Sequence, residues 1–176
     1  MRIFSINTAK GEYIMILFSW LNKQEKALWL PKLFDLLYDN MSVIAPSGLT
    51  YEQDKEQWLA NVDPALDKAP RQIILCFVNH DLAGYIQYYT REKLLMIEEM
   101  QLKKAYQRTF VFYRFCKHLM ACLPSDIEYI EAYAEKRNRS SQKIMQKLGM
   151  VPVAEEENSA FVHLCGSAGI AKKLFR

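Results

Sequence analysis

Apolar residues recur with two different periods along the chain, and these periods predict strands alternating with helices. A continuous apolar run, Gln72–Val78, is separated by a polar turn from a second run, Leu82–Tyr89. Two apolar runs joined by a short turn predict an antiparallel hairpin. Leu94–Leu102 is a further strand candidate with two adjacent acids at its centre, Glu98 and Glu99. We therefore expect three successive strands in the middle of the chain.

After these strands the pattern changes to the period of a helix. Phe110–Leu123 is apolar on most of its faces, so we expect a largely buried helix that begins after the N-cap Thr109. Ile127–Ala134 returns to the alternation of a strand, and Asn138 marks the start of a second helix. Gly149 should end that helix, because glycine adopts the left-handed conformation without a steric cost. The region predicts a strand, helix, strand, helix unit.

Two capping boxes predict further helices ahead of these strands. They are Asn22-x-x-Glu25 and Thr50-x-x-Gln53, in which the cap side chain and the residue three positions later satisfy free backbone N–H groups. Pro31 should break or restart the first of these helices, since proline fits the first turn of a new helix.

The composition fits one folded domain without a membrane span. The chain has 176 residues, 51% of them hydrophobic, with six Gly and six Pro, so we expect a sizeable core. Tyr13–Leu21, the most apolar run near the start, is about half as long as a membrane span. The four cysteines form no C-x-x-C pair, which favours reduced thiols and a cytoplasmic protein. Cys116, His118 and Cys122 are of metal-ligating types, but we prefer core packing for them and expect no metal.

Positive charge is concentrated in the second half of the chain. Residues 100–154 contain ten Lys or Arg and four acids, a balance of +6 in a chain whose total is +3. Several of these cations flank the expected start of the helix at Phe110, where free N–H groups and the helix dipole favour an anion. This pattern is typical of a phosphate site, although a solvated basic face explains the charge equally well.

Three segments of this region resemble the GNAT superfamily of acyl-CoA-dependent N-acyltransferases, over about residues 72–164. The loop from Gln107 to Phe112 stands where the family has Gln/Arg-x-x-Gly-x-Gly/Ala, and Leu82–Ile86 resembles its second central strand. The family signature Asn-x-x-Ala-x-x-Leu-Tyr-x-Lys-x-Gly-Phe is matched by Asn138, Ser141 (for Ala), Ile144, Lys147, Gly149 and Met150. The chain departs from these patterns where Phe110 and Phe112 replace small residues and Met145 replaces the tyrosine.

The resemblance implies a fold and an activity. The fold would be α/β (α+β), with a mixed, mostly antiparallel central sheet flanked by helices. One domain would span residues 1–176, with an N-terminal strand and acceptor-side helices in 1–70 and the sheet and CoA-binding core in 71–165. The activity would be transfer of an acetyl group from acetyl-CoA to a primary amine of a small-molecule or peptide acceptor. A homodimer is left open, and neither nucleic acid nor a membrane is expected as a partner.

The resemblance also implies which residues contact CoA. The strand end would offer backbone groups to the pantetheine arm, the following loop would hold the pyrophosphate, and the second helix would complete the site. The implied residues are Met100, Gln101, Leu102, Gln107, Arg108, Thr109, Phe110, Val111, Phe112, Asn138, Ser141 and Met145. Because Phe110 and Phe112 are about 200° apart on a helix, one ring should pack on the sheet and the other lie beside the phosphates or under the N-terminal helices.

The two adjacent acids are the candidate general bases for removing a proton from the amine. Neighbouring residues of a strand face opposite sides, so one acid should point to each face. Glu98 shares the alternation of Leu102 and is the first choice, but a β-bulge would reverse that phase in favour of Glu99. A structural alternative is a carboxylate that bonds to Tyr88 or Tyr89 or pairs with a nearby arginine.

Two other function classes stay open. The replaced loop residues and Met145 are compatible with an inactive GNAT-fold protein that binds a partner or ligand, since methionine has no proton for the departing thiolate. Tyr133 is a weak substitute for the missing tyrosine. Basic residues interleaved with aromatic ones at 106–113 are also compatible with nucleic-acid binding, which we rank last because we expect these aromatics on buried helix faces.

Overall fold

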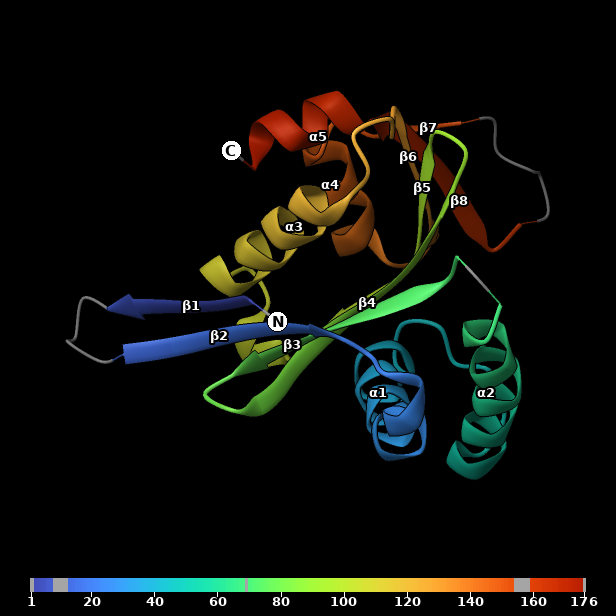
Figure 1. Ribbon diagram of the computed structural model, residues 1–176. Coiled ribbons are helices and arrows are strands. Elements are labelled where there is room, and N and C mark those ends of the chain that lie inside the picture. Colours follow the sequence, from blue (N-terminus) through green and yellow to red (C-terminus); the bar gives the residue numbers. More distant parts are fainter. Residues whose placement is uncertain (1, 8–12, 69, 154–158, 176) are drawn as a thin grey trace.

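A computed structural model describes residues 2–7, 13–68, 70–153 and 159–175, and its framework is one eight-stranded sheet (Figure 1). The strand order is β1-β2-β3-β4-β5-β6-β8-β7, and only β5 and β6 pair in parallel. The strands are β1 (Arg2–Asn7), β2 (Tyr13–Trp20), β3 (Gln72–Val78), β4 (Asp81–Arg91), β5 (Leu94–Leu102), β6 (Tyr129–Glu135), β7 (Val151–Pro152) and β8 (Phe161–Ser167). The expected mixed, mostly antiparallel sheet is confirmed.

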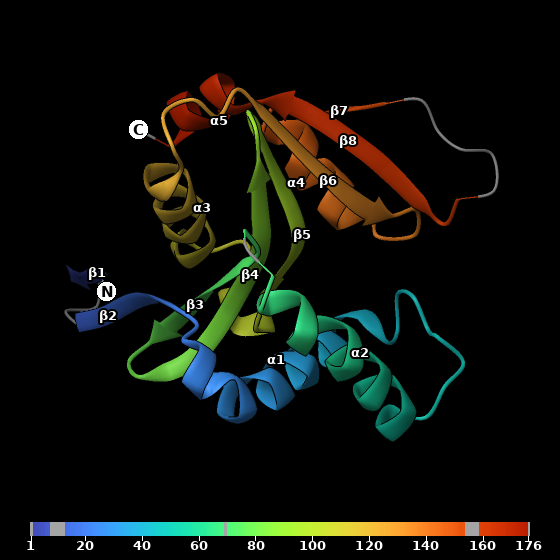
Figure 2. The ribbon, with the colours of Figure 1, turned by 45° about the vertical axis from the view of Figure 1, so that its right-hand side comes forward.

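Helices cover both faces of this sheet, as Figure 2 shows. The helices are α1 (Lys26–Met41), α2 (Tyr51–Leu66), α3 (Phe110–Cys122), α4 (Arg139–Lys147) and α5 (Ala168–Leu174), with short 3-10 turns at Lys23–Glu25 and Lys104–Tyr106. Alternate residues of the strands point to opposite faces and build two cores. Leu75 and Tyr85 pack with α1 and α2, whereas Ile74 and Ile86 pack with α3 and α5.

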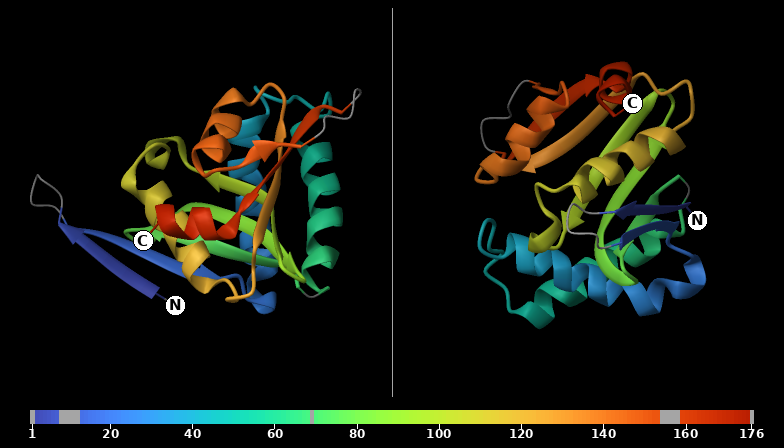
Figure 3. Two further views of the ribbon diagram at one scale, coloured as in Figure 1. Left: turned by 90° about the horizontal axis from the view of Figure 1, so that it is seen from above. Right: turned by 90° about the vertical axis from the view of Figure 1, so that its left-hand side faces the viewer.

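Local sequence signals place most of these elements. The cap residue Thr109 accepts a hydrogen bond from Val111 N (3.2 Å), and Asn138 accepts one from Ser141 N (3.0 Å). Gly149 ends α4 with a φ of +79°. The N-terminal region holds two strands rather than the one expected, because the apolar run near the start forms β2, which joins β1 to the rest of the sheet (Figure 3).

The expectation that Pro31 breaks or restarts a helix is wrong. Pro31 lies inside α1, and Pro64 lies near the end of α2, where it does not stop the helix before Leu66. A proline in a helix interior costs a hydrogen bond and normally kinks or breaks the helix. Here burial of the apolar face of α1, including Leu30 and Leu33, outweighs that cost.

The parallel pairing of β5 with β6 stops part-way along both strands. The last matched pair is Ile97 with Ala132, whereas β5 runs on to Leu102 and β6 to Glu135. The strands therefore separate beyond Ala132, and backbone groups of β5 on that side make no bond to β6. This separation opens the cleft described next.

Candidate active site

A cleft of about 800 Å³ lies between the separated strands. Its walls come from β5, β6, the two N-terminal helices, the loop before α3 and the first turns of α4. The side chains of α1 are tied to the strand end: Asn40 Nδ2 donates to Gln101 Oε1 (2.9 Å) and to the carbonyl oxygen of Leu102 (3.0 Å). The cleft is therefore built from segments far apart in the sequence.

Most of the residues implied by the family resemblance meet in this cleft. Those that line it are Glu98, Glu99, Met100, Gln101, Leu102, Gln107, Arg108, Phe112, Asn138, Ser141 and Met145. Three others do not line it. Thr109 caps α3, Val111 is buried in the core beneath, and Phe110 is 40% exposed on the outer side of the helix. The helical period places Phe110 on a different face from Phe112, which lines the cleft and packs against the core.

The expectation that the aromatic residues of α3 lie on buried faces is wrong in part. Phe110 is 40% exposed and Tyr113 is 37% exposed, although the Tyr113 ring lies 5.3 Å from that of Phe175 in α5. Phe110 and Tyr113 therefore lie on sides of α3 that stay partly open to solvent.

A β-bulge decides how the two acids are presented. The register between β4 and β5 passes from Gln87 opposite Glu99 to Tyr88 opposite Ile97, so Glu98 is an extra residue without a partner in β4. Such a bulge breaks the strict alternation of side chains. Both acids therefore interact with groups on the α1/α2 face, and the expectation that they point to opposite faces is wrong.

Glu98 is held by an arginine from the start of β3. Arg71 Nε donates to Glu98 Oε2 (2.5 Å), and a second guanidinium nitrogen of Arg71 donates to Oε1. Gln87 Nε2 also donates to Glu98 Oε2 (3.0 Å). The guanidinium lies over the ring of Tyr89, 5.6 Å from its centroid. Glu98 is thus an ion-paired carboxylate, the structural alternative that the sequence left open.

In the part of the chain that the structure describes, no cation pairs with Glu99. Burial raises the pKa of its carboxyl to about 7, while the neighbouring polar side chains of Tyr85, Gln101 and Trp58 act to lower the pKa. Among the described residues, its buried oxygen Oε1 has no hydrogen-bond partner of ordinary geometry. A carboxyl group that titrates near neutral pH in a cleft has the property required of a general base.

The opposite end of the cleft carries positive charge. Lys104, Arg108 and Arg139 line it, and within the described parts of the chain Lys104 and Arg108 make no ion pair. Arg108 has a φ of +59°, an uncommon conformation for a residue other than glycine. Gln107 fixes this loop by donating from Nε2 to the carbonyl oxygen of Leu102 (3.0 Å). The first turns of α3 and α4 contribute Phe112, Arg139, Ser140 and Ser141 to the lining of the cleft, and helix N-termini carry free N–H groups.

Comparison with known proteins gives matches in structure and none in sequence. No family model matches the chain, and no curated protein matches it in sequence. An acetyltransferase from Thermus thermophilus superposes with a TM-score of 0.67 at 15% identity, over 86% of this chain and 96% of that one. The PaiA N-acetyltransferase from Thermoplasma acidophilum, solved with coenzyme A, gives 0.62 at 13% identity over 86% and 98%. An uncharacterized protein from Bacillus halodurans gives 0.67 at 12% identity over 98% and 94%.

This chain has the GNAT fold. The matches include structures described as GNAT proteins, and the identities, all near 10–15%, carry the fold alone. The GNAT fold explains the order of the elements: the strand with the bulge, the loop and helix after it, and the parallel strand that separates from it.

Two positions in this GNAT fold were not found from the sequence. Asn40 and Trp58 line the cleft from α1 and α2, and neither belongs to a local motif. The N-terminal helices are expected on the acceptor side of the fold, but the way they pack against β5 decides which of their side chains line the cleft. The periodicity of α2, which places Trp58 on the same face as Val62, was the available signal.

The position of the missing tyrosine is filled by Met145, which lines the cleft. Tyr133 lines it from β6, with its ring stacked on His163 at 4.5 Å between centroids. His163 Nε2 lies 3.0 Å from Glu131 Oε2. Tyr133 is therefore a tyrosine that lines the cleft, although it belongs to β6 and not to α4.

The cysteines and histidines gather no metal site within the described ranges of the chain, where no group of three His, Cys, Asp or Glu side chains comes together. His118 is buried and stacks on Phe18 at 4.5 Å, and burial raises the pKa of Cys116 to about 12. Over the described residues, no helix is long and apolar enough to cross a membrane.

Proposed function

We propose that this protein is an N-acyltransferase that transfers an acetyl group from acetyl-CoA to a primary amine. The observation that carries the proposal is Glu99, a carboxyl group with a pKa raised to about 7 at the point where β5 and β6 separate. The GNAT fold and its acetyltransferase neighbours, one of them in complex with coenzyme A, support the same reaction class.

The cleft has the features that an acyl-CoA requires. Its basic end offers Lys104, Arg108 and Arg139 to phosphate groups, together with the N–H groups of two helix N-termini. Between this end and the acids, Met100 and Met145 line the cleft with apolar surface. Bound there, acetyl-CoA would supply an activated acyl group as a thioester. Phe112 stands where a small residue would let the phosphates approach the backbone, so we expect a narrowed phosphate site.

The reaction then needs a base and an oxyanion donor from the protein. Glu99 accepts a proton from the acceptor ammonium, and the amine nitrogen attacks the thioester carbon. A C–N bond forms and the C–S bond breaks, and the nitrogen loses its second proton, which passes through Tyr133 or water to the departing CoA thiolate. Backbone N–H groups of β5 beyond Ile97, which make no bond to β6, donate to the oxyanion.

This proposal is tested by following thiol release from acetyl-CoA in the presence of mixed primary amines. We expect turnover that rises as the pH passes about 7, because only the ionised Glu99 carboxylate acts as a base. Glu99→Gln should lower kcat by about a hundredfold or more. The control is Glu128→Gln, which removes an exposed carboxylate paired with Lys93 and should keep full activity. Binding of acetyl-CoA without turnover on any amine contradicts the proposal.

That outcome would support a second candidate, an inactive GNAT-fold protein that binds CoA or another ligand. Two observations favour it: Met145 has no proton to donate, and Phe112 occupies the phosphate end of the cleft. A CoA thiolate leaves without a general acid near neutral pH, though more slowly, so we place catalysis first.

A further inference from the structure

The charge at the apex of the cleft is nearly balanced within the protein. We define the apex by Trp58, Ile97, Glu98, Glu99, Ala132 and Tyr133, which surround the point where β5 and β6 separate. Its two carboxylates are Glu98 and Glu99, and Arg71 neutralises the first through two hydrogen bonds. At most one negative charge, that of Glu99, is therefore left for a ligand at the apex.

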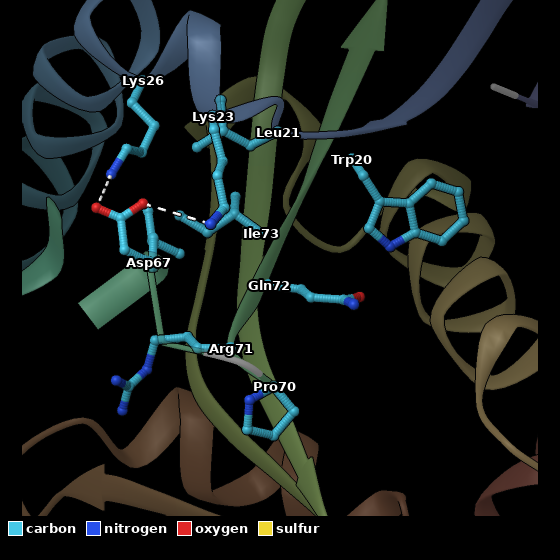
Figure 4. Close-up of a pocket in the computed structure, with 10 residues that line it drawn as sticks. Trp20, Leu21, Lys23, Lys26, Asp67, Pro70, Arg71, Gln72 and Ile73 are labelled. Atoms are coloured by element: carbon cyan, nitrogen blue, oxygen red, sulfur yellow. Dashed lines mark hydrogen bonds and ion pairs between the residues drawn. The ribbon is translucent and has the colours of Figure 1, made fainter. Parts of the chain in front are cut away.

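Arg71 reaches the apex from outside the cleft. It does not line the cleft but lines a separate hollow of about 370 Å³ between β2, β3 and the ends of α1 and α2 (Figure 4). In that hollow the cations Lys23 and Lys26 pair with Asp67, so the acids there do not compete for Arg71. Its guanidinium is directed to Glu98 and rests over Tyr89.

Two buried oxygen atoms at the apex, one of Glu99 and one of Gln87, have no hydrogen-bond partner of ordinary geometry among the described residues. Gln87 is 7% exposed, its Nε2 is used by Glu98, and its Oε1 has no partner among the described residues. Glu99 Oε1 also has no partner of ordinary geometry among the described residues, and the buried hydroxyl of Tyr85 is a polar neighbour of Glu99 that lowers its pKa. Gln87 lies opposite Glu99 in the strand register, so the two residues are neighbours across β4 and β5. Buried acceptors of this kind require N–H or O–H donors.

We propose that the apex binds a primary amine with a single positive charge on an otherwise uncharged body, and that Arg71 sets this limit by neutralising Glu98. The inference rests on the proposed function and names its acceptor class. The ammonium group donates to Glu99, which lines the cleft. The remainder of the acceptor meets Trp58, Ile97 and Ala132, which offer apolar surface and no charge. A second cation on the acceptor finds no unpaired carboxylate, and an anion meets Glu99.

The test compares three acceptors of one length: pentylamine, cadaverine, which adds a second ammonium, and aminopentanoate, which adds a carboxylate. With wild-type protein and acetyl-CoA at neutral pH, pentylamine should have the highest kcat/KM. Arg71→Gln leaves Glu98 unpaired and should raise the kcat/KM ratio of cadaverine to pentylamine by about tenfold, the size expected for one added charge at close range. Arg71→Lys keeps the charge and should keep the wild-type ratio.

A second variant works in the opposite direction and does not depend on how well the Arg71 variants fold. Glu98→Gln leaves the Arg71 cation unneutralised and should raise the ratio of aminopentanoate to pentylamine by about tenfold. Loss of a purely structural contact would lower all three rates together and leave both ratios unchanged, and that result overturns the inference. A wild-type preference for cadaverine or aminopentanoate also overturns it, while leaving the acetyltransferase proposal intact. No turnover with any amine contradicts both.

Discussion

At the scale of single residues, the two adjacent acids show how strongly surroundings decide the chemistry of a side chain. Glu98 has an arginine and an amide as donors, whereas Glu99 has polar neighbours, buried surroundings and no cation. Burying an ionised carboxylate without a neighbouring cation costs free energy, so burial favours the protonated form. One carboxyl group is thereby kept as an ion pair, and its neighbour is available to exchange a proton near neutral pH.

The cost of burying Glu99 predicts a stability that depends on pH. Its pKa is about 7 in the folded protein and near the ordinary glutamic-acid value when unfolded, so unfolding releases a proton between these values. The contribution of Glu99 to the free energy of unfolding of the wild type is therefore fully present below the lower pKa. This contribution is lost as the pH rises to about 7. Glu99→Gln should be more stable than wild type above that pH, by up to about 3 kcal/mol.

Urea unfolding at a series of pH values measures this effect. The gain from Glu99→Gln should be absent near pH 4, should grow through the interval between the two pKa values, and should stay constant above it. The same substitution at Glu98 removes an ion pair and should destabilise instead. A gain for Glu99→Gln that does not change with pH would show that Glu99 is not buried as a carboxylic acid.

Phe112 is the second residue whose surroundings make a prediction. Its ring lines the basic end of the cleft and packs against the core, so Phe112→Gly should widen the phosphate site and tighten CoA binding. The lost packing and the helical glycine should together lower stability by about 2 kcal/mol or more.

Calorimetric titration with CoA checks this effect, with Phe110→Gly as the matched control. Phe110 precedes Phe112 by two positions, is 40% exposed and does not line the cleft, so its removal should leave the affinity unchanged. If Phe112→Gly abolishes binding in a protein that stays folded, the ring is part of the binding site and the steric argument is wrong.

At the scale of elements, the separation of β5 from β6 creates the cleft, and the helices at its rim must begin at fixed residues. Asn138 holds the start of α4 by accepting from Ser141 N, and its Nδ2 lies 3.7 Å from Met41 Sδ at the end of α1. The close pairing of β4 with β5 has its own requirement. A side chain at Gly84 would overlap the carbonyl oxygen of Gln101, so this position needs glycine.

The cap at α4 gives a prediction for this scale. Asn138→Ala should lower the free energy of unfolding by about 1 kcal/mol, because the N–H of Ser141 loses its acceptor. Asn138→Ser restores a capping oxygen and should recover most of the stability. Thermal unfolding of the wild type and the two variants measures how much the cap stabilises the protein. Titration of the same three proteins with CoA shows whether Asn138 also contacts the ligand. If it does, Asn138→Ser regains stability without regaining affinity for CoA.

At the scale of the whole molecule, the sheet joins the first and last parts of the chain into one structure. β1 and β2 extend the sheet on one side, β8 and β7 on the other, and two cores fill the space beneath the helices. Each core is built from alternate residues of the same strands. The cleft lies where β5 and β6 separate, and residues from both halves of the chain line it.

Periodicity and caps were sufficient to predict most elements, since these signals act over a few neighbouring residues. The hairpin of β3 and β4, the helix at Phe110 and the cap at Asn138 were predicted in this way and are confirmed. The same signals failed at Pro31, where long-range packing outweighs a local preference, and missed β2, whose role depends on pairing with β3. The GNAT-type motifs predicted the position of the cleft, because they combine residues from several elements of the fold.

The sequence by itself determined the order of the elements, the basic loop and the presence of two acids on a central strand. Only the tertiary structure decided which acid is paired, because the bulge at Glu98 depends on the register with β4 and Arg71 comes from 27 positions earlier. Tertiary packing also brought Trp58 and Asn40 to the cleft. The physical reason is that hydrogen-bonding patterns and helix periods are local, whereas burial, ion pairing and pKa values depend on which distant segments fold against one another.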